Sequence, residues 1–368
     1  MNTIIEKINE NNISIESIQR ASAILERGGL VAFPTETVYG LGGDGLSALA
    51  ATKIYTAKGR PSDNPLIIHV AEIGTVYDLA EDINDHARML MEAFWPGPLT
   101  IIFNKKDHVP GSTTGGLSTV AIRMPSHPVA LALIKESGLC IAAPSANTSG
   151  RPSPTCAQHV IEDLVGKVEM IIDGGAVGIG IESTIIDVTG ELPIILRPGY
   201  ITKAMLEQVI GEVVMDRALE EVGEEIKPKA PGMKYTHYAP KGELTIVEAR
   251  VEKKQRLEEQ YGVLKDTVSY SKIVSKINKL AAAKMAEGFK VGIIATEDNA
   301  KDYKADLVIN IGAREDALTV SAKLYGVLRE FDHEDIEYIF SESFSNDDFG
   351  YAIMNRLIKA AGHRMIYV

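Results

Sequence analysis

The chain has 368 residues and a formal net charge of −12, with 45% hydrophobic and 24% charged residues. It is too long for one typical domain and suits two, and its composition is that of an ordinary globular protein. The acidic balance argues against a protein whose whole surface binds nucleic acid, although it leaves room for a local basic groove.

The sequence has no apolar run long enough to span a bilayer, and its first residues lack the basic-then-apolar layout of a signal peptide. Its two cysteines, Cys140 and Cys156, lie far apart and in no metal-ligand spacing. We therefore expect a cytoplasmic protein with no membrane partner, in which both thiols are buried as small hydrophobic groups.

Helical and strand signals are interspersed over the first two hundred residues. Helical spacing predicts helices over 15–27, 47–57, 84–95, 128–137, 155–165 and 202–210. Short apolar runs predict strands over 30–33, 66–70, 99–103, 120–123, 140–143, 171–172, 184–188 and 194–197. Because these strands and helices follow no steady rhythm, we expect an α/β domain with an α+β-type twisted mixed sheet.

The pattern breaks over residues 215–241, which carry an acidic patch and then several prolines. This composition predicts a linker. Its second half, 230–240, has two tyrosines, a histidine and a lysine between prolines, which favours an ordered arm with contacts to make, although an inert spacer stays possible.

A second set of elements follows the linker. Strand candidates cover 244–247, 291–295, 307–311 and 336–340, and helical stretches lie around 273–287, 317–331 and 351–361. Strands separated by helix-length segments predict a second, smaller Rossmann-like α/β domain with a parallel sheet. The expected domains are therefore 1–214, a linker over 215–241, and 242–368.

Two cations, Lys58 and Arg60, stand one residue apart on a loop that also contains Gly59, Pro61 and Pro65. The glycine lets the backbone approach a ligand and the prolines stiffen the loop. Two fixed cations suit a polyanion such as a triphosphate. Taken alone, however, a Lys-x-Arg pair is more typical of a solvated surface turn.

The segment 34–45 contains a literal G-x-G-x-x-G from Gly40 to Gly45, with Asp63 at a distance suggestive of a dinucleotide site. We reject that interpretation because a six-residue segment separates the glycines from the preceding strand, and because Asp63 lies in a proline-rich loop. A polar strand-end loop whose hydroxyls, Thr35 and Thr37, face a small ligand is the better hypothesis.

The loop 143–153 follows a buried strand and carries hydroxyl, amide and guanidinium donors that suit phosphate or ribose oxygens. A merely connecting Ser/Asn-rich turn is the alternative.

Arg123 lies among apolar residues on a strand and shares a face with Thr119. Its guanidinium needs an anionic partner, which can be a structural carboxylate or a ligand carboxylate. A lone histidine such as His69 is more typically a satisfied core imidazole.

Taken together, these segments resemble the threonylcarbamoyl-AMP synthase family, whose proteins contain a YrdC-like domain. The resemblance runs in family order from about residue 12 to 210, and the proline-flanked 231–240 resembles the linker of the long, two-domain form. The matching segments are Lys58-Gly59-Arg60-Pro61 with Asn64-Pro65-Leu66, then 95–100, 120–125, Ala143-Pro144-Ser145-Ala146-Asn147-Thr148-Ser149-Gly150, 173–175, 182–184 and 197–199.

The resemblance implies an L-threonylcarbamoyladenylate synthase, a nucleotidyltransferase. Such enzymes condense L-threonine, bicarbonate or CO2, and ATP into threonylcarbamoyl-AMP and pyrophosphate. The product feeds N6-threonylcarbamoyladenosine formation in tRNA through a partner transferase, and direct tRNA contact is possible. Mg2+ would come with the ATP phosphates, and no protein ligand for it is identified.

The family's site residues map onto this chain one by one. Lys58 and Arg60 would be catalytic, stabilising the triphosphate and the departing pyrophosphate, and Tyr235 would belong to a lid over the carbamate. The ATP-binding positions would be Arg60, Asn64, Thr119, Ser145, Asn147, Ser153, Arg197 and His237. The L-threonine-binding positions would be Thr37, His69, Arg123, Ala143 (through its backbone) and Ser183, with Arg123 pairing the carboxylate. No nucleophile is paired with an activating base, so we expect no covalent intermediate.

Two other functions are alternatives to this one. One is an RNA-binding YrdC-like module without catalysis, against which the acidic balance and the polar small-molecule residues argue. The other is the carbamoyl-transfer enzyme of hydrogenase maturation, which shares this domain. That enzyme needs further N-terminal domains and Cys-pair zinc motifs, and this chain has neither.

Overall fold

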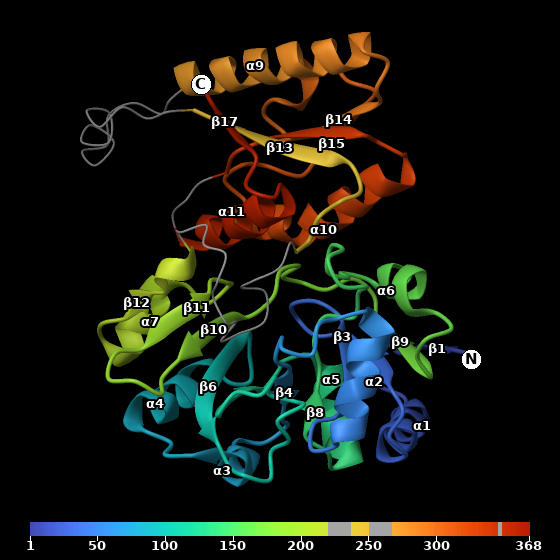
Figure 1. Cartoon of the computed structure of the whole chain (residues 1–368), viewed down its shortest axis with the longest axis vertical. Coiled ribbons are helices and arrows are strands. Elements are labelled where there is room, and N and C mark those ends of the chain that lie inside the picture. The colour runs from blue at the N-terminus through green and yellow to red at the C-terminus, as the bar shows by residue number, and fades with distance from the viewer. Residues whose placement is uncertain (220–236, 250–266, 345–347) are drawn as a thin grey trace. The chain divides into compact units, whose positions relative to one another are not determined.

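The computed structural model describes residues 1–219, 237–249, 267–344 and 348–368. Contacts between residues divide the chain into two units, Met1–Tyr235 and Thr236–Val368 (Figure 1). The division falls within the segment 215–241 that the sequence assigns to a linker. Each unit is described by itself below.

The first unit contains one mixed sheet of twelve strands, in the order β1-β9-β2-β3-β8-β4-β7-β6-β10-β11-β12, with β5 paired to β6. The sheet contains both parallel pairs, such as β4 with β7, and antiparallel pairs, such as β6 with β7. This confirms the mixed sheet expected from the sequence. The strands are β1 Ile4–Lys7, β2 Val31–Phe33, β3 Gly40–Asp44, β4 Ile67–His69, β5 Ala80–Glu81, β6 Leu99–Lys105, β7 Thr119–Arg123, β8 Ile141–Ala142, β9 Met170–Asp173, β10 Thr184–Asp187, β11 Ile194–Arg197 and β12 Val214–Met215.

Four helices of this unit begin at a side chain that caps them. The side chains of Ser14, Ser47, Asn84 and Thr202 each accept a hydrogen bond from a backbone N–H three residues further on, which satisfies a donor that the first turn leaves unpaired. The helices are α1 Ile15–Glu26, α2 Ala48–Lys58, α3 Val76–Leu79, α4 Asp85–Phe94, α5 Pro128–Ser137, α6 Ala157–Leu164 and α7 Lys203–Ile210, with short 3₁₀ turns η1 Ile73–Thr75 and η2 Arg217–Leu219.

The glycine-rich segment after β2 is a strand, which the sequence analysis missed. β3 pairs antiparallel with β2 on one side and with β8 on the other. A Cβ atom on Gly42 would lie 2.8 Å from Phe33 Cε1 and 2.9 Å from Ile141 Cγ2. Glycine is therefore needed here for close packing inside the sheet. The glycines within 40–43 therefore form no phosphate-binding turn, which agrees with the rejection of a dinucleotide site. The polar loop expected over 34–45 is confined to residues 34–39.

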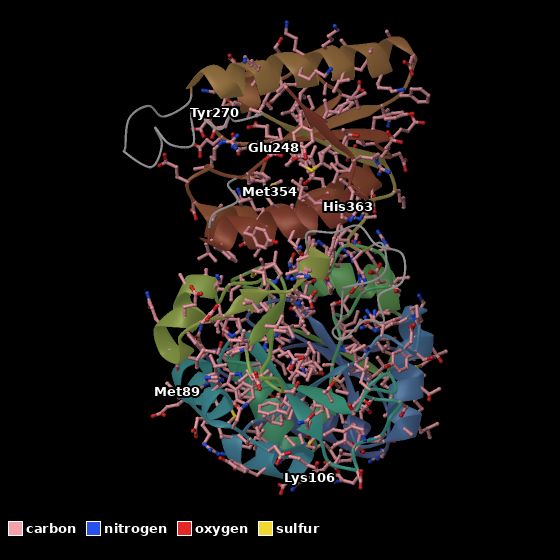
Figure 2. All side chains as sticks on the ribbon, turned by 60° about the vertical axis from the view of Figure 1, so that its left-hand side comes forward. Met89, Lys106, Glu248, Tyr270, Met354 and His363 are labelled. Carbon is pink, nitrogen blue, oxygen red and sulfur yellow. The ribbon has the colours of Figure 1, made fainter. Side chains whose placement is uncertain are left out.

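Side chains fill the space between the sheet and its helices (Figure 2). Apolar residues of β6 and β7 form one cluster with α4 and α7, while residues of β2 and β9 pack against α1 and α5 in another. Met89 lies on the outside of the first unit and is 44% exposed, whereas Met354 lies inside the second and is 1% exposed. Each unit therefore has a core of its own.

The second unit contains a five-stranded parallel sheet in the order β15-β14-β16-β13-β17. One helix, α9, lies on one face of the sheet, and α10 and α11 lie on the other (Figure 1). This confirms the small Rossmann-like α/β unit, with β17 as a strand that the sequence analysis missed. The elements are β13 Glu243–Glu248, α9 Thr267–Ala286, β14 Val291–Ala295, η3 Ala300–Asp302, β15 Leu307–Asn310, α10 Ala317–His333, β16 Tyr338–Glu342, α11 Asp348–Ala360 and β17 Met365–Tyr367.

None of the helices in the described parts of the chain has the length and apolar character needed to cross a membrane. Both cysteines are free thiols of intermediate exposure, so the expectation that they are buried was too strong. Partial burial still raises the pKa of the Cys140 thiol to about 11, which makes it a poor nucleophile at neutral pH.

Replacing Gly42 with alanine should destabilise the first unit, because the added methyl group collides with two side chains that are themselves buried. We expect the free energy of unfolding in urea to fall by about 1–3 kcal/mol. A Cβ atom on Gly74 would meet nothing within 4 Å beyond its chain neighbours and the backbone of its own turn, so Gly74→Ala is the matched control and should change stability little. Equal stabilities for the two variants would contradict the packing argument.

Candidate active site

The ammonium group of Lys58 joins two loops that lie about ninety residues apart in sequence. Lys58 closes α2, which ends at Gly59 in the left-handed conformation (φ 62°). Its Nζ donates to the carbonyl oxygen of Ser145, and to the carbonyl oxygen and Oδ1 of Asn147 at 2.5 and 3.3 Å. The side chain is only 2% exposed. The surface-turn alternative for this segment is therefore wrong.

Arg60 is held on the same loop by the residues that precede β4. Its Nη2 donates to Asn64 Oδ1 at 2.6 Å and to the carbonyl oxygen of Pro65 at 3.0 Å, and its Nε donates to the carbonyl oxygen of Asn64 at 3.2 Å. Arg60 and Asn64 are both buried. The structure thus places Lys58, at the start of this loop, against Ser145 and Asn147. Arg60 bonds within the loop to Asn64.

The buried carboxylate of Asp163, on α6, accepts hydrogen bonds that hold the loop 143–153 in place. Its Oδ1 accepts from Arg151 Nη1 at 2.7 Å and its Oδ2 accepts from the backbone N–H of Thr148 at 3.1 Å. Further along the loop, Ser153 Oγ donates to Glu182 Oε1 at 2.6 Å. These contacts connect the loop to the segment just before β10, so it is an ordered element and not a passive connection.

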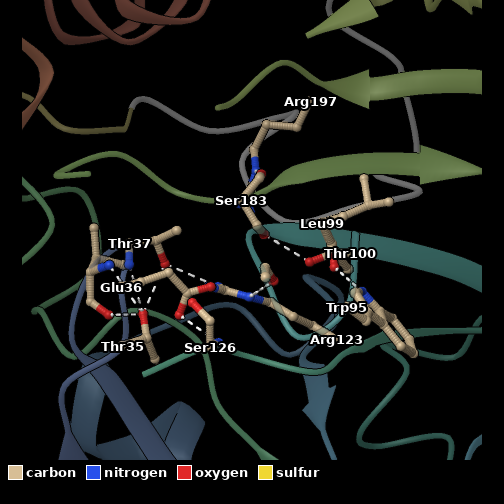
Figure 3. A network of polar contacts seen from close by, with 12 residues as sticks. Thr35, Glu36, Thr37, Trp95, Leu99, Thr100, Arg123, Ser126, Ser183 and Arg197 are labelled. Atoms are coloured by element: carbon tan, nitrogen blue, oxygen red, sulfur yellow. Dashed lines mark hydrogen bonds and ion pairs between the residues drawn. The ribbon is translucent and has the colours of Figure 1, made fainter. Parts of the chain in front are cut away.

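Arg123, the last residue of β7, lies at the centre of a second group (Figure 3). Its Nη1 donates to Thr37 Oγ1 at 3.0 Å, its Nη2 pairs with Glu36 Oε1 at 2.6 Å, and its Nε donates to the carbonyl oxygen of Gly97 at 3.3 Å. The guanidinium is 4% exposed and the Glu36 side chain is 14% exposed. The sequence left open whether the anionic partner of Arg123 is a carboxylate of the protein or one of a ligand. In the structure the protein supplies a carboxylate, that of Glu36.

Ser183 connects the first residues of β6 and β10 to the end of β11. Its hydroxyl lies 2.7 Å from Thr100 Oγ1 and accepts from Arg197 Nη2 at 3.1 Å, while Arg197 Nε donates to its carbonyl oxygen at 3.0 Å (Figure 3). Thr100 faces Arg123 across the antiparallel β6–β7 pair. Ser183 and Arg197 therefore lie beside the Arg123 group.

His69 ends β4 and faces Arg123 across the parallel β4–β7 pair. Its ring packs edge-on against Phe33, and Nδ1 lies 3.2 Å from the carbonyl oxygen of Ile67. Burial, together with the positive charge of Arg123, lowers the pKa of His69 to about 3. The imidazole is therefore neutral at physiological pH, as suits a core histidine beside a guanidinium.

Four predicted site residues lie outside these two groups. Thr119 opens β7, at the opposite end of the strand from Arg123, and pairs with Asn104. The Ala143 N–H donates to the carbonyl oxygen of Ile67 at 2.9 Å, so a ligand contact through this backbone would have to use the carbonyl. His237 belongs to the second unit, where its ring lies 5.4 Å from that of Tyr238. Tyr235 lies outside the described residues.

Sequence reasoning missed three polar residues that the structure places in these groups. They are Glu36, Thr100 and Glu182. Each lies within a segment that was singled out, but its role depends on a partner far away in the sequence. The signal that pointed to Glu36 was the need of Arg123 for an anion.

No group of three or more His, Cys, Asp or Glu side chains suited to a metal ion occurs within the residues that the structure describes. The donors assembled here are ammonium, guanidinium, hydroxyl and amide groups. Such donors bind anionic oxygens, above all those of phosphates and carboxylates.

The low pKa of His69 predicts a specific loss of stability in acid. Below pH 6.5 the unfolded chain protonates this histidine while the folded protein does not until about pH 3, so the free energy of unfolding falls as the pH falls between these values. We expect wild type to lose about 1 kcal/mol per pH unit more than His69→Gln over this range. Urea denaturation at several pH values measures both slopes, and parallel slopes would refute the assignment.

Comparison with known protein families gives matches in both units of the chain. Residues 23–199 match a family model described as "Telomere recombination", of the Sua5, YciO and YrdC proteins. Residues 201–362 match a second model, described as the C-terminal domain of threonylcarbamoyl-AMP synthase. The two models cover both units.

Full-length relatives agree with the family models. The chain is 49% identical over 350 residues to the threonylcarbamoyl-AMP synthase of Bacillus subtilis, covering 95% of this chain and 94% of that protein. It is 45% identical over 367 residues to the enzyme of the same name from Pyrococcus abyssi, covering 100% of both. The crystal structure of P. abyssi Sua5 complexed with L-threonine, 44% identical, matches all of this chain and all of that one with a TM-score of 0.89. The chain belongs to the threonylcarbamoyl-AMP synthase family, in its two-domain form.

Proposed function

We propose that this chain is an L-threonylcarbamoyladenylate synthase, a nucleotidyltransferase that makes threonylcarbamoyl-AMP and pyrophosphate from L-threonine, bicarbonate or CO2, and ATP. The observation that carries the proposal is the buried Lys58 ammonium, which joins the Lys-x-Arg loop to the Ser-x-Asn loop. These are the two segments whose cations and hydroxyls suit a triphosphate and a ribose. The names of the full-length relatives support the same activity.

The Arg123 group forms the amino-acid end of the proposed site. The Arg123 guanidinium donates to the Thr37 hydroxyl, and the Ser183 hydroxyl lies next to Thr100, which faces Arg123 on the neighbouring strand. A guanidinium and two nearby hydroxyls suit a carboxylate and a small hydroxylated side chain. The P. abyssi relative has been crystallised with L-threonine, which supports threonine as the substrate here. His69, being neutral, adds no competing charge at this end.

The chemistry needs positioning and charge neutralisation more than acid–base side chains. The α-ammonium group of threonine first loses a proton, and the free amine then adds to CO2 and loses a second proton to give a carbamate anion. A carbamate oxygen attacks the α-phosphorus of ATP, and the bond from that phosphorus to the leaving pyrophosphate breaks. Lys58 and Arg60 would neutralise the triphosphate and the departing pyrophosphate. The remaining predicted ATP contacts are those of Asn64, Thr119, Ser145, Asn147, Ser153, Arg197 and His237, and Tyr235 would belong to the lid that excludes water from the carbamate.

Mg2+ would enter with ATP and supply further neutralisation of the phosphate oxygens. The donors that this chain gathers around Lys58 are cationic or neutral and would not ligate a metal ion. These donors would instead bind the phosphate oxygens that Mg2+ leaves available. The product would pass to a partner transferase that modifies tRNA. A cytoplasmic location, where ATP and tRNA are abundant, fits this role.

Pyrophosphate release tests the proposal directly. With ATP and Mg2+ present, release should require both L-threonine and bicarbonate, because neither ATP hydrolysis nor a nucleotide exchange needs an amino acid. The measurement is coupled detection of pyrophosphate, with omission of each substrate as the control. Release at the same rate without threonine would overturn the proposal. Salt-sensitive RNA binding without any ATP turnover would instead favour the non-catalytic RNA-binding module.

Replacing Arg123 with alanine should chiefly raise the KM for L-threonine. Loss of a charge-assisted carboxylate contact costs roughly 2 kcal/mol, or about a thirtyfold increase in KM. The KM for ATP should change much less. Arg20→Ala, which removes an exposed arginine paired with Glu6 in the same unit, is the matched control. An effect confined to the ATP KM would move Arg123 to the nucleotide end of the site.

A further inference from the structure

Glu36 is the one site carboxylate that touches the guanidinium of Arg123 within the described residues. Its Oε1 pairs with Arg123 Nη2 at 2.6 Å, and its Oε2 accepts from the backbone N–H of Ser126 at 3.2 Å (Figure 3). The backbone of the segment is also fixed, since the carbonyl oxygen of Glu36 accepts from the N–H of Ile179 at 3.0 Å. Glu36 is therefore a fixed negative charge beside Arg123.

Arg123 still has donors to offer while Glu36 is in place. A guanidinium carries five N–H groups. Contacts within the described residues use one on Nε, one on Nη1 and one on Nη2. One N–H on each terminal nitrogen is thus left for a substrate carboxylate, so Glu36 need not leave before a substrate binds.

A carboxylate that takes those two donors has Glu36 as a like-charged neighbour, because both bind the same guanidinium. Repulsion between them weakens the binding of any simple carboxylic acid. An α-amino acid is different, because its ammonium group lies one carbon from its carboxylate and can be placed between the two negative charges. A carboxylate ion has about four acceptor positions, and the contacts of Glu36 leave some of them for such an ammonium.

We propose that Glu36 is a specificity residue that recognises the α-ammonium group of L-threonine while Arg123 binds its carboxylate. Together the two side chains select a zwitterionic amino acid over an acid that lacks the amine. The inference rests on the proposed function and deepens it, since it assigns amine recognition to a residue outside the predicted threonine contacts.

The test is a cycle of two proteins and two ligands, measured by titration calorimetry on the full chain. The ligands are L-threonine and the dihydroxy acid that carries a hydroxyl in place of the α-amino group. The proteins are wild type and Glu36→Gln. We expect Glu36→Gln to weaken threonine binding about tenfold or more, while the dihydroxy acid binds equally well or better. The preference of the protein for the amine should therefore shrink at least tenfold.

Two other patterns would overturn the inference. If both ligands weaken equally in Glu36→Gln, the residue only positions Arg123. If both tighten equally, it only competes for the guanidinium. Glu10→Gln makes the same charge change at an exposed residue that contacts His127, and should leave the preference unchanged. Glu36→Asp keeps the negative charge and should therefore keep most of the preference for threonine over the dihydroxy acid. If Glu36→Asp loses that preference as fully as Glu36→Gln does, the ammonium group is not recognised by charge.

The failure of this inference is distinguishable from failure of the proposed function. Threonine-dependent pyrophosphate release by wild type tests the function without involving Glu36. If release depends on threonine and the amine preference is the same in wild type and Glu36→Gln, the inference alone is wrong.

Discussion

Burying the ammonium group of Lys58 is the constraint on which the arrangement of the site depends. A charged amine taken out of water costs several kcal/mol unless oxygens replace its hydration shell. The oxygens that do so belong to Ser145 and Asn147, nearly ninety residues further along the chain. The loop after α2 and the loop after β8 must therefore meet, and the donors they carry gather at one place.

The same reasoning applies to Arg123, with a different result. Here the guanidinium is compensated by a carboxylate, Glu36, as well as by Thr37 and a backbone carbonyl. Its neighbour His69 is kept neutral by burial and by the guanidinium itself. One positive and one negative charge are thus held side by side, which is the arrangement that a zwitterion complements. The two groups divide the proposed site into an end with cationic and neutral donors for phosphate and an end with a matched ion pair for an amino acid.

Local signals in the sequence predicted many elements well because their causes are local. A hydroxyl or amide at the cap of a helix satisfies its own first turn, and the predicted helices 47–57 and 84–95 begin at the residues, Ser47 and Asn84, whose side chains cap them in the structure. The strand β3 was missed because its glycines lack side chains and follow no apolar alternation. What requires Gly42 is the packing of Phe33 and Ile141 from neighbouring strands, and this close approach exists only once the sheet has formed.

By itself, the sequence determined the fold class and the family, and it identified Lys58, Arg60, Asn147 and Arg123 as residues of interest. These conclusions depend on residue types and their order along the chain, which are local properties. Only the tertiary structure decided that Lys58 binds the loop 143–153, that Glu36 pairs with Arg123, and that His69 is neutral. Each of these depends on burial and on a partner brought near by sheet pairing, because the energy of a charge is set by its surroundings in space.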